Sequence, residues 1–180
     1  MAEDKVTVNR APVLTLWGAV VAVRMGYTWE EALTLGKAVA GLNAQSKGRT
    51  LGIFGPPKAV ERSTGKPKKV GLGEDFWITV VGRPVPAKRI EEGVRAVIGD
   101  KPIDPAGVEE YLESKLGERY ADVRAAMEEL ADSMPAKDLT DVAYALYEEF
   151  RPKIPAGKRG WGAAGELDLD LVRDLAARRR

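Results

Sequence analysis

An apolar segment near the start of the chain constrains the fold more than any other feature. Residues 13–23, VLTLWGAVVAV, contain no charged residue, and Thr15 is the one hydroxyl side chain among them. Pro12 suits the first turn of a helix, where its missing N–H has no intrahelical partner. A helix that is apolar on nearly every face has to be buried, and this one is shorter than the ~20 residues that span a membrane. We therefore predict a helix from Pro12 to Met25 deep in the core.

A second helix is predicted from Trp29 to about Leu42, because its apolar residues recur at helical spacing. Thr28 and Glu31 have the spacing of a capping box, in which each side chain accepts a hydrogen bond from the backbone N–H of the other residue. Gly26 stands just beyond the first helix, where a left-handed residue often ends a helix. The two helices are thus expected to form a hairpin.

The chain becomes polar and then basic after this hairpin. Residues 43–50 are polar, and Gly48 is expected to end the helical part. We predict a short strand at 51–54 and a long loop, rich in Gly, Pro and Lys, at 55–73. Loops of this length without secondary structure are usually functional or mobile.

Residues 76–98 favour antiparallel strands. β-branched and aromatic residues fill 76–81, and turn signals at Gly82 and at Gly93 separate them from two further strands, so we predict a meander. The alternative is one helix over 87–98, since AKRIEEGVRAVI is also nearly amphipathic. A glycine in the middle of a helix costs about 1 kcal/mol, and Gly93 therefore favours the strands.

The last third of the chain is predicted to be helical. Asp104 followed by Pro105 is typical of a helix start, and a Gly-rich basic loop at 154–165 precedes the final element. The predicted helices are 105–116, 119–134, 139–150 and 167–175. The expected fold class is α+β, with an N-terminal helical hairpin, a small antiparallel β-meander and a C-terminal helical part. We expect two parts, 1–103 and 104–180.

Charge is distributed unevenly along the chain, although the net charge is only +1. Residues 44–73 hold seven Lys/Arg against one Asp/Glu, and residues 104–150 hold four against thirteen. Residues 151–180 are basic again, with eight against four. The charge of a segment decides its partners more than the total does, so the first basic segment is a candidate for binding a polyanion.

The chain has no histidine and no cysteine. Ser-His-Asp triads and zinc sites built on His or Cys are therefore excluded, and no catalytic motif stands out among the carboxylates, lysines and tyrosines. We expect a non-enzymatic protein without catalytic residues, metal ligands or a cofactor. The first ten residues, MAEDKVTVNR, lack the apolar centre of a secretory signal, and no span is long enough for a membrane. We expect a cytoplasmic protein.

The stretch from Ala22 to Leu35, AVRMGYTWEEALTL, resembles the helix-turn-helix motif of DNA-binding proteins. Ala22 matches the small residue of the first helix, Gly26 the turn, and Ala32 and Leu35 buried positions of the second helix. The resemblance implies that the second helix enters the major groove. The chain departs from the motif at Trp29-Glu30-Glu31, where a recognition helix should present polar or basic side chains. The alternative is a plain helical hairpin that forms core or a dimer face.

Two further resemblances concern short stretches. The turn Met25-Gly26-Tyr27 is similar to the first loop of ubiquitin-associated-type three-helix modules, which would imply peptide binding. AGLNAQSKGR and RPKIPAGKRGWGAAGELDLD look like stretches of an uncharacterised conserved bacterial protein family, a resemblance that implies no activity. Trp161 in the second of these stretches is expected either to stack on a base or to hold a loop on the domain, and we favour the structural role.

The basic segment provides the leading functional hypothesis. A strand after two helices, followed by a basic loop and a hairpin, is similar to a winged helix, and cationic side chains that contact phosphates release counterions without reading sequence. The predicted function is non-enzymatic DNA or RNA binding. The predicted contact residues are Asn43, Gln45, Ser46, Lys47, Arg49, Lys58, Arg62, Lys66, Lys68 and Lys69.

The alternative is a protein-interaction or self-association module that binds no nucleic acid. In that hypothesis the basic loops dock on acidic helices. A homodimer would form through the N-terminal helices, whose apolar side chains would supply the dimer face: Leu14, Trp17, Val20, Val21, Trp29 and Leu33.

Overall fold

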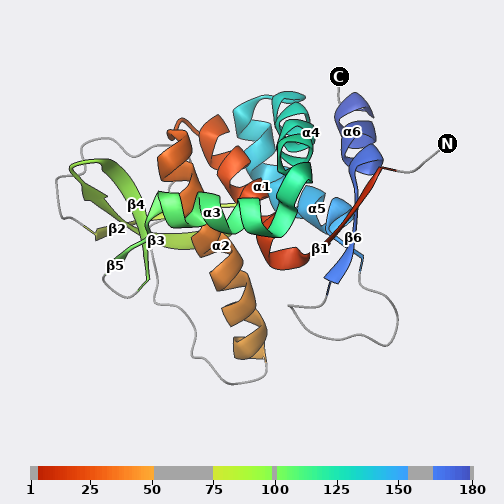
Figure 1. The fold of residues 1–180 in the computed structure, drawn as a ribbon. Helices are drawn as coiled ribbons and strands as arrows, with labels where there is room; N and C mark the ends of the chain where they lie inside the picture. Colours follow the sequence, from red (N-terminus) through yellow and green to blue (C-terminus); the bar gives the residue numbers. More distant parts are fainter. Residues whose placement is uncertain (1–3, 51–74, 99–100, 154–163, 179–180) are drawn as a thin grey trace.

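The structure is a computed structural model, and it describes residues 4–50, 75–98, 101–153 and 164–178. Within these ranges the fold is α+β, as predicted: helices occupy the centre, a four-stranded antiparallel sheet lies at one end, and a two-stranded sheet lies at the other (Figure 1). In chain order the elements are β1 (Lys5–Asn9), α1 (Arg10–Arg24), α2 (Trp29–Thr50), β2 (Asp75–Val80), β3 (Arg83–Ile90), β4 (Gly93–Ile98), β5 (Lys101–Pro102), α3 (Pro105–Leu116), a 3-10 turn η1 (Gly117–Arg119), α4 (Tyr120–Asp132), α5 (Ala136–Phe150), β6 (Ala164–Asp168) and α6 (Leu169–Arg178).

Helix α1 lies at the centre of the molecule. Every residue from Pro12 to Ala22 is buried, which confirms the burial that the apolar segment predicted. Helices α2, α3, α4 and α5 all pack against α1. These helices come from both sides of residue 104, the predicted border between two parts of the chain. The buried apolar side chains of the described residues nevertheless form one core.

The crossing of α1 and α2 is unusually close. A Cβ atom built on Gly36 would lie 2.1 Å from the backbone oxygen of Thr15, and one built on Gly18 would lie 2.9 Å from the Cα atom of Gly36. Both distances are far below ordinary van der Waals contact. The two glycines therefore allow a separation between the helices that no other residue would permit.

The turn between these helices has the predicted geometry. Gly26 has a φ of 111°, a conformation that glycine adopts without steric cost. The capping box is also confirmed: the Thr28 N–H donates to Glu31 Oε1 at 2.9 Å, and the Glu31 N–H donates to Thr28 Oγ1 at 3.2 Å.

The same glutamate joins α2 to the sheet. Glu31 is only 4% exposed, and its second carboxylate oxygen, Oε2, accepts a hydrogen bond of 2.7 Å from the Val94 N–H. One turn later, Thr34 Oγ1 accepts from the Ala96 N–H at 3.0 Å. Two side chains of α2 thus satisfy buried donors of β4, which fixes the position of the sheet on the helices.

The antiparallel meander is confirmed. Strand β2 pairs with β3, and β3 pairs with β4. The alternative of one helix over 87–98 is wrong, because Gly93 has a φ of 129° and begins β4 after a tight turn. A Cβ atom at Gly93 would also lie 2.9 Å from Glu31 Oε2, so the glycine is required by the contact with α2.

Helix α2 is longer than predicted. It runs without interruption to Thr50, and Gly48 does not end it. A glycine inside a helix costs only about 1 kcal/mol, which does not outweigh the hydrogen bonds of the flanking turns. The predicted strand at 51–54 and the predicted loop at 55–73 lie outside the described residues.

The C-terminal helices are those that the sequence predicts, but two of them begin elsewhere: α5 begins at Ala136 rather than Leu139, and the last helix begins later than predicted. Asp104 Oδ1 accepts a hydrogen bond of 3.1 Å from the Ala106 N–H and so caps α3. The helix predicted from Leu167 instead begins at Leu169, and Leu167 belongs to β6. The reason is the antiparallel pairing of β6 with β1, in which Leu167 lies opposite Val6.

Charged side chains reinforce the link between the two ends of the chain. Asp4 forms ion pairs with Arg119 of η1 and with Arg173 of α6, the latter at 2.7 Å. These two guanidinium groups, Arg119 first, lower the pKa of the Asp4 carboxyl from its ordinary value. The carboxylate therefore holds β1, η1 and α6 together in its ionised form.

We predict that Gly36→Ala destabilises the protein strongly. The added methyl group meets backbone rather than a movable side chain, so the free energy of unfolding should fall by about 3 kcal/mol. Urea denaturation measures this change. Gly41→Ala, on the same helix, is the control, because a Cβ atom there has nothing within 4 Å. Equal stability of the two variants would contradict the close crossing.

We predict that the stabilising effect of Asp4 depends on pH. Because its pKa is lower in the folded state, the carboxylate stabilises the fold fully above the unfolded-state pKa and loses this effect as the pH falls below about 4. The wild type should therefore be more stable than Asp4→Asn at pH 7 and lose that advantage towards pH 2. Asp141→Asn, at an exposed position of α5, is the control. A constant difference across this pH range would contradict the role of the ion pairs.

Candidate functional site

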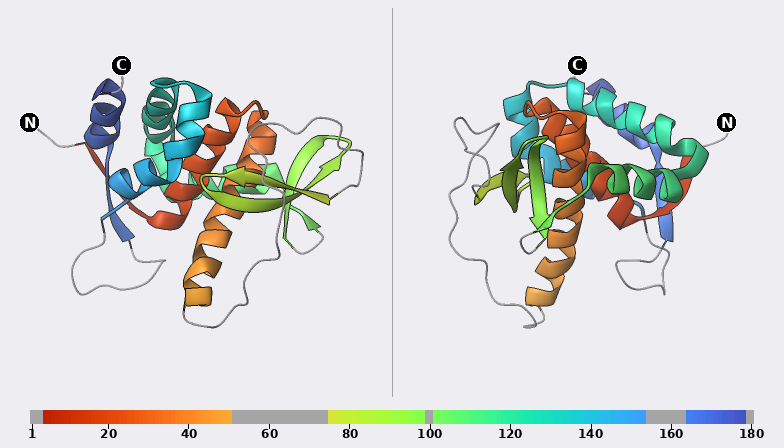
Figure 2. Two further views of the ribbon diagram at one scale, coloured as in Figure 1. Left: turned by 180° about the vertical axis from the view of Figure 1, so that it is seen from behind. Right: turned by 60° about the vertical axis from the view of Figure 1, so that its left-hand side comes forward.

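The predicted nucleic-acid contacts fall into two groups in the structure. Asn43, Gln45, Ser46, Lys47 and Arg49 lie in the last turns of α2, and this end of the helix extends beyond the body of the molecule (Figure 2). Lys58, Arg62, Lys66, Lys68 and Lys69 lie outside the described residues. The structure thus places the first group together on one projecting helix end.

The first turn of α2 is occupied by internal contacts. Glu31 accepts a hydrogen bond from β4, the Arg124 guanidinium of α4 lies 3.8 Å from the centre of the Trp29 ring, and Arg95 Nη2 is 3.8 Å from Glu30 Oε2. In a helix-turn-helix protein this turn would face the bases. Here the corresponding side chains contact the protein itself.

The apolar face proposed for a dimer lies inside the molecule. Leu14, Trp17 and Val21 are fully buried, and Val20 and Leu33 are 3% and 2% exposed. Trp29 is partly buried against the same core. The expectation that these side chains form a dimer face is therefore corrected. Helix α1 lies between four other helices, and these side chains already pack against the protein's own helices and strands.

A cluster of arginines and tyrosines forms where the start of α1 meets the end of α5. We call it the arginine–tyrosine cluster, and its members are Arg10, Arg83, Tyr144, Tyr147 and Arg151. Arg10 Nε donates a hydrogen bond of 2.9 Å to the Pro152 oxygen. This hydrogen bond holds the first residue of α1 beside the end of α5. Arg151 is the residue that directly follows α5.

Aromatic contacts hold the other members in place. The Arg83 guanidinium lies 5.1 Å from the centre of the Tyr144 ring, and the Tyr144 and Tyr147 ring centres are 6.0 Å apart. Tyr147 in turn makes an edge-to-face contact with Phe150 at 6.0 Å. These contacts join the first residue of β3 to the buried end of α5, and they belong to the core that contains Trp17.

The electrostatics of the cluster are those of a site with excess positive charge. Burial, and then repulsion by Arg151, lowers the pKa of Arg10. Burial raises the pKa of Tyr147, and the positive charges of Arg10 and Arg151 counteract that shift. Among the described residues, no carboxylate forms an ion pair with Arg10 or Arg151.

The Tyr147 hydroxyl is the most unusual group in the cluster. The residue is fully buried, and its hydroxyl has no hydrogen-bond partner within the described part of the chain. Buried hydroxyl groups nearly always have a partner, so this one needs an explanation.

Sequence reasoning did not find this cluster. The sequence predicts a turn at Gly82 and a basic segment from residue 151 onwards, and it assigns no role to Arg83 or Arg151. The members come from α1, β3, α5 and the residue after α5, so no local spacing signals them. The only available signal was the basic character of 151–165, which did not point to Arg10.

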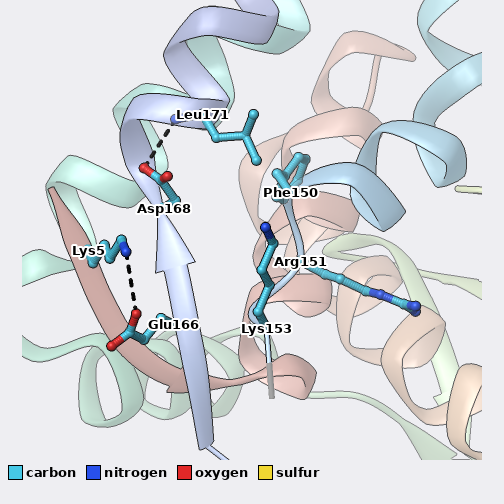
Figure 3. A pocket seen from close by; sticks show the side chains of 7 residues that line it. All are labelled: Lys5, Phe150, Arg151, Lys153, Glu166, Asp168 and Leu171. Atoms are coloured by element: carbon cyan, nitrogen blue, oxygen red, sulfur yellow. Dashed lines mark hydrogen bonds and ion pairs between the residues drawn. The ribbon is translucent and has the colours of Figure 1, made fainter. Parts of the chain in front are cut away.

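A small pocket of about 70 Å³ lies beside the cluster, between β1, β6 and the end of α5 (Figure 3). Three of its polar side chains have partners: Lys5 Nζ is 3.6 Å from Glu166 Oε2, and Asp168 Oδ1 accepts from the Leu171 N–H at 3.2 Å. Figure 3 shows the Arg151 side chain pointing away from Lys5 and Glu166. Arg151 lines this pocket as well as belonging to the cluster, whereas Arg10 and Tyr147 do not line it.

In the described part of the chain, no group of three or more acidic side chains is placed to bind a metal ion. Within the same ranges, no helix combines the length and the apolar character that a membrane crossing requires.

Comparison with family models, with curated protein sequences and with solved structures finds no match for this chain.

We predict that Tyr147→Phe stabilises the protein. The substitution removes a buried hydroxyl without a partner and keeps the ring, so the free energy of unfolding should rise by about 1 kcal/mol. Tyr120→Phe is the matched control, because the Tyr120 hydroxyl donates to Glu109 Oε2 at 2.8 Å and its loss should lower stability by about 1 kcal/mol. A destabilised Tyr147→Phe variant would show that the hydroxyl has a partner within the protein.

Proposed function

We propose that the protein is a non-enzymatic nucleic-acid-binding protein that contacts phosphates through the end of α2 and the basic residues that follow it. The observation on which the proposal depends is the continuation of α2 to Thr50. This continuation carries the backbone of Lys47 and Arg49 beyond the body of the molecule (Figure 2).

The distribution of charge supports the same end of the molecule. The acidic residues of 104–150 belong to α3, α4 and α5 and the turns between them, and the end of α2 extends away from α4 (Figure 1). A nucleic acid at the end of α2 would thus avoid much of the repulsion from these carboxylates. Basic residues on one extended element are a common electrostatic footprint of nucleic-acid binding.

The proposed mode differs from that of a helix-turn-helix protein. The first turn of α2 is engaged with β4 and α4, so we assign the contacts to its C-terminal end. Contacts of this kind bind phosphates and do not read bases. The protein is therefore proposed to bind nucleic acid with little sequence preference, in a reducing compartment such as the cytoplasm, with which the lack of cysteine agrees.

The prediction is that binding to mixed-sequence duplex DNA and to single-stranded RNA weakens steeply with salt. Replacing Lys66, Lys68 and Lys69 together by Ala should make the dependence of log affinity on log salt shallower by up to about 3 units for duplex DNA, because each lost phosphate contact contributes about 0.9. A Lys47→Ala and Arg49→Ala double variant should reduce the slope by up to about 2 units. Fluorescence anisotropy at several salt concentrations measures these slopes.

The control variant removes three positive charges, as the triple lysine variant does, but from other parts of the protein. Lys101, Lys115 and Lys137 are exposed on β5, α3 and α5, and replacing all three by Ala should leave the slope nearly unchanged. No binding at low salt, or an equal effect of the control variant, would overturn the proposed function.

A further inference from the structure

The pocket between β1, β6 and the end of α5 is lined by side chains of both charges (Figure 3). Lys5 Nζ is 3.6 Å from Glu166 Oε2, so these two side chains already compensate each other. Arg151 also lines the pocket, but its side chain points away from Lys5 and Glu166. Lys153 and Asp168 are the remaining charged residues, and they form no ion pair with each other or with any other described residue. One cation and one carboxylate of the pocket are therefore available to a ligand.

The backbone holds Lys153 beside β6. The Lys153 N–H donates to the Glu166 oxygen, and the Glu166 N–H donates to the Lys153 oxygen, both at 3.1 Å. This approach depends on Gly165, because a Cβ atom there would lie 2.6 Å from the Lys153 oxygen, far below ordinary van der Waals contact. Figure 3 shows the Lys153 side chain extending from this point towards Phe150. The side chain is exposed, so a ligand from solvent can reach its ammonium group.

The start of α6 holds Asp168. Its Oδ1 atom accepts a hydrogen bond of 3.2 Å from the Leu171 N–H, which is the contact of a helix N-cap. An ionised carboxylate can accept several hydrogen bonds, and this one accepts no other from the described residues. Asp168 is partly exposed and lines the pocket. The carboxylate is thus fixed by one contact and can still accept hydrogen bonds from a ligand.

The size of the pocket limits the ligand. Its volume of about 70 Å³ is several times the ~10–15 Å³ that one water molecule needs, and it is far below the ~300 Å³ of a pocket for a drug-sized molecule. The ligand therefore consists of a few heavy atoms.

The lining argues against phosphate as that ligand. Phe150 and Leu171 form an apolar part of the wall, against which some of the phosphate oxygens would lose their hydrogen bonds. The carboxylates of Glu166 and Asp168 would also repel a doubly charged anion. A molecule with one negative end, one positive end and a short apolar group suits this lining better.

We propose that the pocket binds the zwitterion of a small α-amino acid. Lys153 contacts the carboxylate of the ligand, Asp168 contacts its ammonium group, and Phe150 and Leu171 face its short side chain. Hydrogen bonds between charged groups are about twice as strong as those between neutral groups. A ligand with both charges satisfies Lys153 and Asp168 together, whereas a simple anion or a simple amine satisfies only one of them.

This site is independent of the proposed function. It is built from β1, β6, the residues after α5 and the start of α6, whereas the proposed nucleic-acid contacts lie at and beyond the end of α2. The test below contains no nucleic acid. Its failure would therefore leave the proposed function untouched, and a failure to bind DNA would leave the amino-acid site untouched.

The test is a titration of the isotope-labelled full chain with L-alanine, followed by the backbone amide signals in NMR spectra. Signals of residues around the pocket, such as Lys153, Glu166 and Leu171, should shift along a curve that saturates as for one site. Sodium acetate and ethylamine hydrochloride, compared at the same ionic strength, should each bind at least about 10-fold more weakly, because each keeps only one of the two charged contacts.

Two variants remove one charge each. The Lys153 side chain makes no hydrogen bond or ion pair to the described residues, so Lys153→Gln is expected to fold. Asp168→Asn keeps a side-chain oxygen that can cap α6. Each variant should weaken the affinity for L-alanine about 10- to 100-fold. Lys137→Gln and Asp141→Asn, at exposed positions of α5, are the matched controls and should bind like the wild type.

The same spectra separate lost binding from lost folding, since a folded variant keeps its dispersed amide signals without the ligand. Shifts that do not saturate, or a response to acetate as strong as that to L-alanine, would overturn the proposal. An affinity for L-alanine that either Lys153→Gln or Asp168→Asn retains in full would overturn it as well.

Discussion

The close contact of α1 and α2 at Gly18 and Gly36 is the constraint on which most of the structure depends. Residues 12–22 of α1 are buried on every face of the helix, so other elements of the protein have to cover all of these faces. With α2 held so near to one face, the remaining faces are available to α3, α4 and α5. Because α1 touches helices from both halves of the sequence, the described residues form one core in which the N-terminal hairpin is the central element.

Polar side chains of α2 then determine where the sheet lies. Glu31 and Thr34 accept hydrogen bonds from the backbone of β4 in a buried environment, where an unsatisfied donor is costly. Glu31 also completes the capping box of its own helix, so one carboxylate begins α2 and places the sheet against it. This use of the first turn explains why the part of the chain that resembles a helix-turn-helix is occupied inside the protein.

Arginine and lysine residues serve different roles in different parts of the protein. The end of α2 carries basic residues beyond the body of the molecule, and the arginine–tyrosine cluster gathers guanidinium groups at the junction of α1 and α5. Elsewhere many arginines have carboxylate partners, such as Arg119 and Arg173 with Asp4. Arg10 and Arg151 form no ion pair with a described residue, and this difference separates them from the arginines whose ion pairs serve the fold.

The sequence by itself determined the features that depend on neighbouring residues. The capping box, the left-handed Gly26, the cap at Asp104 and the turns of the meander follow from short-range hydrogen bonds and backbone conformation, and the burial of α1 follows from its composition. Only the tertiary structure decided that Gly36 meets Thr15, that β1 pairs with β6 from the other end of the chain, and that Arg10 lies near Arg151 and Tyr147. These contacts depend on which buried faces meet after the chain has closed long loops, and no local pattern encodes that choice.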